Sequence, residues 1–332
     1  MGEGIVFSII IPFKKWSPYL DECLTHIQQL KFKFYEVILL PDGELEIPRV
    51  YNNINFQVIS TGEINPALKR DQGAEKALGK YLAFLDDDAY PRYDWLDVAQ
   101  SVFLSQKDVG AIGGPGVTPN TDSYWARVSG AVFLSPISGG FPERYVPIPP
   151  YRSVDDWPSV NLIVRKSVFD QIEGFDSNYW PGEDTLFCLK IIRDTSFKIM
   201  YVPDLLVWHH RRPGLQKHLR QVGNYGMHRG YFTKIYPETS RRFKFFIPAL
   251  WLIFVLAGPA CSFLFSWAWF LYLMGWGAYL VAIGFCFRDI LRHEPAWVVL
   301  GAAPYILLTH LWYGTKFIQG LTTQTLQSSL GR

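Results

Sequence analysis

Two long uncharged stretches toward the C-terminal end limit what this chain can fold into. Phe245–Phe265 and Trp267–Phe287 each run for about 20 residues without a charged side chain, which is long enough to cross a bilayer as a helix. A third apolar run, Pro295–Tyr313, contains His310 but no fully charged residue. Trp and Tyr are frequent in these runs, as they are at membrane surfaces. We therefore expect membrane helices at about 245–265, 267–287 and 295–313, with a buried soluble helix as the alternative for the third run.

Basic residues gather beside these runs. Between His209 and Lys244 there are nine Lys or Arg and one acid, although the whole chain has a net charge of only +2. The loop with Arg288 and Arg292 is also basic. Because basic loops remain on the cytoplasmic side, we predict an integral membrane protein with a cytoplasmic N-terminal domain. A local basic segment also fits membrane lipids as partners better than nucleic acid, and we expect no nucleic-acid partner.

Two further features agree with a cytoplasmic domain. The opening stretch MGEGIVFSIIIP lacks the basic segment that begins a signal peptide, so we expect none. The four cysteines are scattered without a CxxC spacing, and we interpret them as reduced.

Strand-like and helix-like segments alternate over the first two thirds of the chain. The predicted strands are Val6–Ile11, Tyr35–Leu40, Phe56–Ser60, Tyr81–Leu85, Val109–Gly114, Asn161–Arg165 and Phe197–Val202. Helical patterns begin at Ser17-Pro18 and at Asn65. Nearly continuous apolar strands separated by helices favour an α/β fold, a mainly parallel sheet with helices on both faces.

Acidic residues follow two of these strands directly. Asp42 comes after one strand, and Asp86, Asp87 and Asp88 come after another. In parallel sheets ligands sit beyond the carboxyl ends of the strands, so we expect these acids to meet in one site. Three adjacent carboxylates repel one another, and a bound Mn²⁺ or Mg²⁺ would offset that repulsion. The alternative is that Asp88 caps the following helix.

A second acidic centre, Glu183-Asp184, precedes an apolar run with helical spacing. The carboxylates could simply stabilise the helix by interacting with the positive end of its dipole. They could also act in catalysis, because a carboxylate within hydrogen-bond reach can remove a proton from an attacking group.

The motif His209-His210-Arg211-Arg212 follows a strand. One histidine could bind the metal or donate to a phosphate, and an arginine could offset the charge of a leaving group. The alternative is a solvated, membrane-facing basic patch. The spacing does not choose between the two histidines.

Two segments have less regular patterns. Pro115–Trp157, rich in Gly, Pro and aromatic residues, predicts a lid or acceptor loop, or else a surface insertion. Leu215–Tyr236 predicts a basic amphipathic helix that anchors the domain to the membrane surface or also holds a lipid phosphate. We divide the chain into a cytosolic domain at 1–214, an interface helix and linker at 215–243, transmembrane helices at 244–321 and a tail at 322–332.

Five sequence motifs occur in a fixed order, and the ordered set is far more specific than any one motif. They are SIIIPF at Ser8–Phe13, LPDGE at Leu40–Glu44, ALKRDQGAEKALGKYLAFLDDDAYP at Ala67–Pro91, NLIVRKSVFDQIEGFD at Asn161–Asp176 and PGEDTLFCLKI at Pro181–Ile191. In this order, over roughly residues 5–235, the chain resembles the inverting family 2 glycosyltransferases of the GT-A fold. Family members with a similar tail of membrane helices act on lipid-linked or cell-envelope glycans.

The resemblance implies roles for individual residues. Asp42 would contact the nucleotide base, Arg70 a phosphate, and Asp86 the ribose, while Asp88 would bind the metal. Asp184 would be the base, with Glu183 orienting the acceptor or the base. The implied nucleotide-sugar contacts are Pro12, Asp42, Arg70, Asp86, Asp87, Trp180 and Arg211. The candidate metal ligands are Asp88, Asp86, His209 and His210.

Some positions depart from the family pattern. Pro41 stands where many relatives have a first acid before Asp42, and Asp71 replaces a frequent Asn. The residues by themselves give Asp87 no chemical role, and Arg70 could be an ordinary surface arginine.

The function implied is transfer of one sugar from a UDP-, GDP- or dTDP-linked donor to a hydroxyl of a lipid-linked glycan, on a carrier such as a polyprenyl (di)phosphate. The QxxRW motif of processive synthases is missing, which favours a single transfer. One alternative is a dolichyl-phosphate-mannose-synthase-like enzyme, whose ionised phosphate acceptor requires no base. The other is a non-catalytic membrane scaffold.

Overall fold

The computed structural model describes residues 4–326, and these form two compact units. The sheet unit comprises residues 4–117 and 146–210, and the helical unit comprises residues 118–145 and 211–326. The predicted range 1–214 therefore includes a stretch, Thr118–Tyr145, that clusters with the helical unit; we call it the inserted segment. Most of the predicted tail at 322–332 lies outside the described residues.

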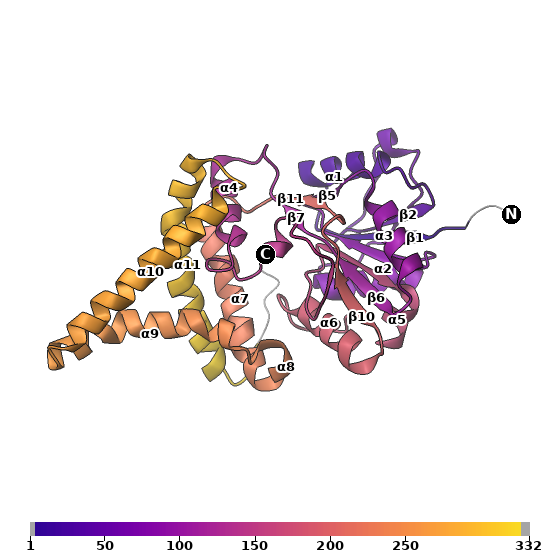
Figure 1. Ribbon diagram of the computed structural model, residues 1–332. Coiled ribbons are helices and arrows are strands. Elements are labelled where there is room, and N and C mark those ends of the chain that lie inside the picture. Colours follow the sequence, from indigo (N-terminus) through magenta and orange to yellow (C-terminus); the bar gives the residue numbers. More distant parts are fainter. Residues whose placement is uncertain (1–3, 327–332) are drawn as a thin grey trace. The chain divides into compact units, whose positions relative to one another are not determined.

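The sheet unit is built on one large and one small sheet (Figure 1). The large sheet has the order β3-β2-β1-β4-β9-β6-β10-β8, and the small one β5-β11-β7. The strands are β1 Phe7–Pro12, β2 Tyr35–Leu40, β3 Phe56–Val58, β4 Tyr81–Leu85, β5 Ala89–Pro91, β6 Val109–Gly113, β7 Gly116–Val117, β8 Arg152–Val154, β9 Asn161–Arg165, β10 Lys198–Tyr201 and β11 Val207–His209. Every strand predicted from the sequence is present, within one or two residues at each end.

The large sheet is mixed rather than purely parallel. β1 pairs in parallel with β2 and β4, and β6 pairs in parallel with β10. β9 runs antiparallel to both of its neighbours, β4 and β6. Its first residue, Asn161, therefore lies opposite Leu85, the last residue of β4. The Asn161 side chain accepts from Trp95 Nε1 (2.9 Å) and donates to the Leu205 carbonyl (2.6 Å), which ties together the loops at this edge.

Helices cover both faces of the large sheet (Figure 1). Side chains alternate along a strand, so Ile9 packs on one face of the sheet and Ile10 on the other. The helices of this unit are α1 Pro18–Gln28, α2 Pro66–Lys76, α3 Trp95–Ser105, α5 Lys166–Gln171 and α6 Glu183–Asp194, with a short 3₁₀ turn at Arg49–Tyr51. α1 and α3 pack on the Ile9 face, and α2, α5 and α6 pack on the Ile10 face.

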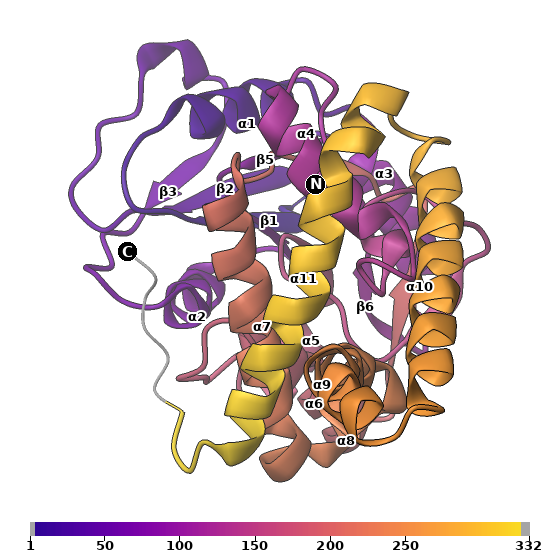
Figure 2. The same cartoon turned by 90° about the vertical axis from the view of Figure 1, so that its left-hand side faces the viewer.

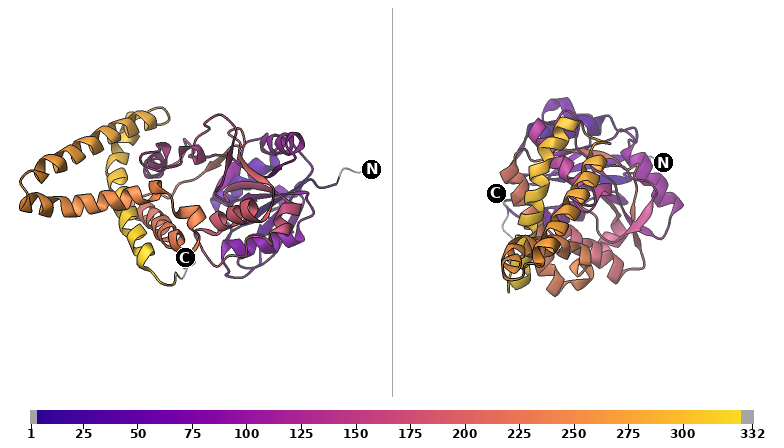
Figure 3. Two further views of the ribbon diagram at one scale, coloured as in Figure 1. Left: turned by 60° about the horizontal axis from the view of Figure 1, so that its bottom comes forward. Right: turned by 60° about the vertical axis from the view of Figure 1, so that its left-hand side comes forward.

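Three helices of the second unit are long and apolar enough to cross a membrane. They are α9 Phe243–Leu264, α10 Ala268–Ile290 and α11 Ala296–Thr322. The remaining helices of this unit are α4 Tyr124–Ala131, α7 Leu215–Ile235 and α8 Pro237–Ser240, with short 3₁₀ turns at Val132–Leu134 and Pro142–Arg144. α9 and α10 are joined by the three residues Phe265–Trp267 (Figure 3). α11 continues to Thr322, beyond its predicted end at Tyr313.

The predicted helix at Leu215–Tyr236 forms as α7 and lies side by side with α11 (Figure 2). Glycines line the contact between the two helices. A Cβ on Gly230 would collide with the Phe317 carbonyl oxygen, and one on Gly320 would collide with the Met227 carbonyl oxygen. Small residues let two helix backbones approach closely. The buried face of α7 therefore packs against α11.

The inserted segment is ordered and is held to the long helices by buried polar contacts. Arg127 of α4 forms an ion pair with Glu294, 2.6 Å away, in the loop between α10 and α11. Ser129 lies 2.9 Å from Nδ1 of His218 on α7, and Nε2 of His218 lies 2.8 Å from the Thr309 hydroxyl on α11. His218 is fully buried. These contacts show that the segment is an integral part of the helical unit and not a loose surface insertion.

Candidate active site

The carboxyl ends of β1, β2 and β4 meet at one edge of the large sheet. These strands are adjacent and parallel, and Pro12 at the end of β1 pairs with Leu40 at the end of β2. Asp42 follows β2 by one residue, and Asp86 follows β4 directly. The acids that follow β2 and β4 thus lie at one edge of the large sheet.

A buried lysine that the sequence reasoning missed holds this edge together. Lys69 of α2 donates from Nζ to the carbonyl oxygens of Phe13 (2.7 Å) and Leu40 (3.0 Å) and to Oδ1 of Asp42 (2.6 Å). Its side chain is only 3% exposed. The ammonium group therefore fixes the position of Asp42 and ties the ends of β1 and β2. The charged run from Lys69 to Asp71 could have indicated this role. A cation in a helix that packs on a sheet is usually paired with an acid or a carbonyl group.

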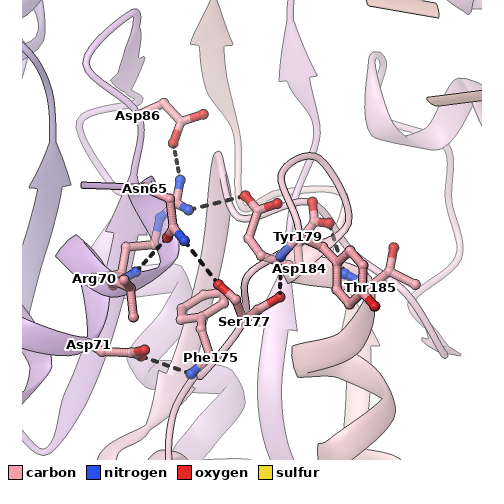
Figure 4. A network of polar contacts seen from close by, with 11 residues as sticks. Asn65, Arg70, Asp71, Asp86, Phe175, Ser177, Tyr179, Asp184 and Thr185 are labelled. Carbon is pink, nitrogen blue, oxygen red and sulfur yellow. Dashed lines mark hydrogen bonds and ion pairs between the residues drawn. The ribbon is translucent and has the colours of Figure 1, made fainter. Parts of the chain in front are cut away.

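The next residue along α2, Arg70, connects the two acidic centres. Its guanidinium lies 2.7 Å from Oδ1 of Asp86 and 3.4 Å from Oε1 of Glu183 (Figure 4). The side chain is 3% exposed and packs over the Phe175 ring, 5.6 Å from its centroid. The alternative of an ordinary surface arginine is therefore wrong. A direct contact between Arg70 and a nucleotide phosphate remains a prediction.

The three consecutive aspartates have different environments. Asp86 faces Arg70, and Asp88 faces His209. Burial, reinforced by the charges of Asp88 and Asp86, raises the pKa of Asp87 to about 8. Asp88 is not a helix cap, because β5 follows the triplet and the next helix, α3, begins only at Trp95.

The structure separates the two neighbouring histidines. His209 ends β11 and pairs with Ala89 of β5, which places its Nε2 atom 3.2 Å from Oδ1 of Asp88. The Nε2 atom of His210 instead lies 2.8 Å from Oε2 of Glu22 on α1, and its ring packs against Tyr19. His209 is therefore the histidine beside the aspartate triplet.

The side chains at this edge suit a cation that a substrate would also bind. Among residues 4–326, no group of three or more His, Cys, Asp or Glu side chains is arranged to hold a metal. Asp88 and His209 offer one carboxylate oxygen and one imidazole nitrogen, and both side chains are partly exposed. Mg²⁺ is usually bound by one or two carboxylates, with substrate phosphates and water as its other ligands. The donor set therefore fits a metal–diphosphate complex and does not fit a closed structural metal site.

The second acidic centre lies at the start of α6. Gly182 has a φ of +116°, a conformation that L side chains rarely adopt, and Glu183 and Asp184 then form the first turn of the helix. Glu183 is 5% exposed, and burial together with the neighbouring Asp184 raises its pKa to about 8 despite the nearby Arg70. Asp184 is partly exposed and accepts from the Thr185 backbone N–H at 2.8 Å. Of the two acids, Asp184 is the more accessible to a substrate.

The last two predicted donor contacts lie further along the chain. Trp180 is partly exposed on the segment that leads into α6. Arg211 belongs to the helical unit, where its Nε donates to the Thr118 hydroxyl at 3.1 Å and its guanidinium packs over the Tyr145 ring. The structure thus gathers all of the predicted site residues except Arg211 in the sheet unit.

Comparisons with known proteins found a matching family model and several relatives. Residues 8–172 match the family model for glycosyl transferase family 2. The chain is 27% identical over 161 residues to a pre-mycofactocin glycosyltransferase of Mycobacterium tuberculosis, a match that covers 48% of this chain and 33% of that protein. It is 21% identical over 238 residues to a dolichyl N-acetyl-α-D-glucosaminyl phosphate 3-β-D-2,3-diacetamido-2,3-dideoxy-β-D-glucuronosyltransferase of Methanococcus voltae, covering 67% of this chain and 72% of the relative.

A solved structure has the same fold. The mannosyltransferase PcManGT of Pyrobaculum calidifontis, in complex with GDP-Man and Mn²⁺, superimposes with a TM-score of 0.55 at 15% identity. The match covers 98% of this chain and 89% of that one. The family match over residues 8–172, together with this fold, shows that the chain contains a glycosyltransferase family 2 domain with a GT-A-like sheet unit.

Proposed function

We propose that this protein transfers a single sugar, with inversion, from a nucleotide-diphosphate sugar to a hydroxyl of a lipid-linked glycan. The observation that carries the proposal is the pair of acidic centres joined by Arg70, which contacts Asp86 at the end of β4 and Glu183 at the start of α6. One centre suits a metal-bound diphosphate, and the other suits an acceptor hydroxyl.

On the donor side, Asp42 would contact the base and Asp86 the ribose. Asp88 and His209 would hold Mn²⁺ or Mg²⁺, which when bound would neutralise charge on the diphosphate. The mixed oxygen and nitrogen donor pair supports this assignment, as does the presence of Mn²⁺ and GDP-Man in the solved mannosyltransferase.

On the acceptor side, Asp184 would be the general base. As the acceptor oxygen forms its bond to the anomeric carbon, the Asp184 carboxylate takes the hydroxyl proton, and the bond to the departing nucleoside diphosphate breaks on the opposite face. Glu183, whose side chain lies 3.4 Å from the Arg70 guanidinium, would orient the acceptor or the base.

The relatives support a lipid-linked acceptor. The Methanococcus voltae relative is named for transfer to a sugar on dolichyl phosphate. The three apolar helices would anchor this chain in the membrane where such acceptors lie, with the sheet unit on the cytoplasmic side.

The first experiment screens UDP-, GDP- and dTDP-sugars for thermal stabilisation of the purified protein with Mn²⁺, because a ligand that binds the folded state raises its melting temperature. The best donor is then supplied in radiolabelled form with a polyprenyl-phosphate-linked sugar as acceptor. We expect metal-dependent transfer. No stabilisation by any donor, with or without metal, would contradict the proposal.

The second experiment separates a hydroxyl acceptor from a phosphate acceptor. Loss of a general base costs typically about 10²- to 10⁴-fold in rate, so Asp184→Asn should abolish most transfer to a lipid-linked sugar while donor binding persists. Asp194→Asn, at the exposed far end of α6, is the matched control. If Asp184→Asn retained the wild-type rate with polyprenyl phosphate as acceptor, the enzyme would instead make a lipid-phosphate sugar.

A further inference from the structure

A turn before α6 has a strained backbone and is held by α2. Glu173, Gly174 and Asp176 have φ values of +58°, +67° and +37°, all in the left-handed region. For Glu173 and Asp176, which have a Cβ, this conformation costs energy and requires support from the surroundings. The turn lies eight residues before Asp184, and the chain between them leads directly into α6.

Asp71 of α2 supplies much of that support. Its Oδ1 accepts from the Phe175 backbone N–H at 2.8 Å (Figure 4). Its Oδ2 accepts from the Asp176 N–H at 3.0 Å. Both oxygens of one carboxylate are thus used by two consecutive backbone donors. An Asn at this position has only one acceptor oxygen, and its amide group would face the second N–H.

Two further contacts hold the same stretch from either side. Asn65, the N-cap of α2, donates from Nδ2 to the Ser177 carbonyl at 3.1 Å, while its Oδ1 accepts from Leu68 N at the start of the helix. From α6, the Nζ atom of Lys190 donates to the carbonyl oxygens of Gly174 (3.2 Å) and Phe175 (3.3 Å). The turn is therefore fixed between α2 and α6.

Arg70 and Asp71 are consecutive on α2 but have different tasks. Arg70 contacts the acids themselves, whereas Asp71 accepts hydrogen bonds from the backbone of the turn. We propose that Asp71 is a positioning residue that sets the location of the base Asp184 by holding the turn at 173–176. This inference rests on the proposed function, because it presumes that Asp184 is the base.

The test compares Asp71→Ala and Asp71→Asn with the wild-type protein and with Glu75→Gln, an exposed position on the same helix. Misplacing a reacting group by about 1 Å can cost roughly 10²-fold in rate. We expect kcat for transfer to fall about 10- to 100-fold in Asp71→Ala and by less in Asp71→Asn. The donor KM and the melting temperature should stay near the wild-type values in Asp71→Asn, and Glu75→Gln should behave as the wild type.

A double-mutant cycle with Asp184→Asn tests whether Asp71 acts through Asp184. If it does, Asp71→Asn should cause little further loss when Asp184 is already Asn, with residual rates measured over long incubations. Fully additive losses would overturn the proposal. So would a wild-type kcat in both Asp71 variants, or a parallel fall of kcat, donor affinity and melting temperature in Asp71→Asn.

The same set of variants separates this inference from the proposed function. Full activity of Asp184→Asn would overturn the role of Asp184 itself. An inactive Asp184→Asn together with fully active Asp71 variants would overturn only the positioning role. Faster amide exchange over residues 175–184 in Asp71→Asn, with unchanged exchange around Asp86, would support the local effect directly.

Discussion

His209 and Asp88 lie 3.2 Å apart at the junction of the two sheets, whereas His210, the next residue, faces Glu22 on α1. The antiparallel pairing of β11 with β5 produces this difference, because successive side chains of a strand point to opposite sides. One histidine is therefore available to the aspartate triplet, and the other helps to attach β11 to α1.

The metal requirement should distinguish the two histidines. We expect His209→Ala to raise the Mn²⁺ concentration needed for half-maximal transfer at least tenfold, because it removes one of the two donors that we propose for the metal. His210→Ala should leave the Mn²⁺ requirement near the wild-type value. A Mn²⁺ titration of both variants at saturating donor checks this, and equal shifts in the two would contradict the assignment.

Arg70 should matter for stability as well as for activity. Arg70→Met removes the buried guanidinium that contacts Asp86 and Glu183, and a hydrogen bond to a charged group contributes about 1.5–3 kcal/mol. We expect a clearly lower melting temperature, with part of the loss recovered in the double variant Arg70→Met/Glu183→Gln. Arg193→Met, at an exposed ion pair with Asp194, should change stability by less than about 1 kcal/mol.

The ion pair between Arg127 and Glu294 should hold the inserted segment to the long helices. Glu294→Gln removes the negative charge that pairs with Arg127, whose guanidinium is mostly buried and lies 5.3 Å from the centroid of the Trp297 ring. We expect a lower melting temperature in detergent, and partial recovery when the charges are exchanged in Arg127→Glu/Glu294→Arg. Arg292→Gln, in an exposed pair, is the control. An unchanged melting temperature in Glu294→Gln would count against this role.

The buried His218 predicts a pH dependence of stability. Its contacts are the Ser129 and Thr309 hydroxyls and the rings of Phe133 and Tyr305, and burial lowers its pKa from 6.5 to about 4. Between these values the unfolded chain binds more protons than the folded one, so stability is complete above pH 6.5 and falls as the pH drops toward 4.

A pKa difference costs about 1.4 kcal/mol per unit, so the free energy of unfolding should fall by roughly 3 kcal/mol as the pH is lowered to about 4. Melting temperatures between pH 5 and pH 7.5 check this. We expect a flatter profile in His218→Gln. His228→Gln should keep more of the slope, because His228 retains a hydrogen bond to the Asn224 carbonyl that opposes the effect of its burial. Parallel profiles for His218→Gln and the wild type would contradict the prediction.

The large sheet could be predicted because its strands are strongly patterned. Tyr35–Leu40, Tyr81–Leu85 and Asn161–Arg165 form strands with the predicted ends, since each contains a strand-length apolar run and is followed by a polar or turn residue. The direction of β9 could not be predicted, because a buried strand shows the same apolar run whichever way it runs. The small sheet was missed because its strands have only two or three residues.

The candidate site shows a similar division. The acids at strand ends could be found from the sequence, because position after a strand and charge are both visible there. The partners of Lys69, Arg70 and Asp71 could not, because they lie far away along the chain and are brought close only by the packing of α2. α4 could not be predicted for the same reason, because the helices that pack on it lie far away along the chain.

The inserted segment has a practical consequence for dissecting this protein. Its buried residues, such as Val128 and Ala131 of α4, are covered by helices that follow residue 210 in the sequence. A truncation at residue 214 would keep α4 but remove α7 and α11, leaving an apolar face open to water. We expect such a fragment to aggregate unless residues 118–145 are replaced by a short polar linker, so a soluble version of this enzyme requires two cuts rather than one.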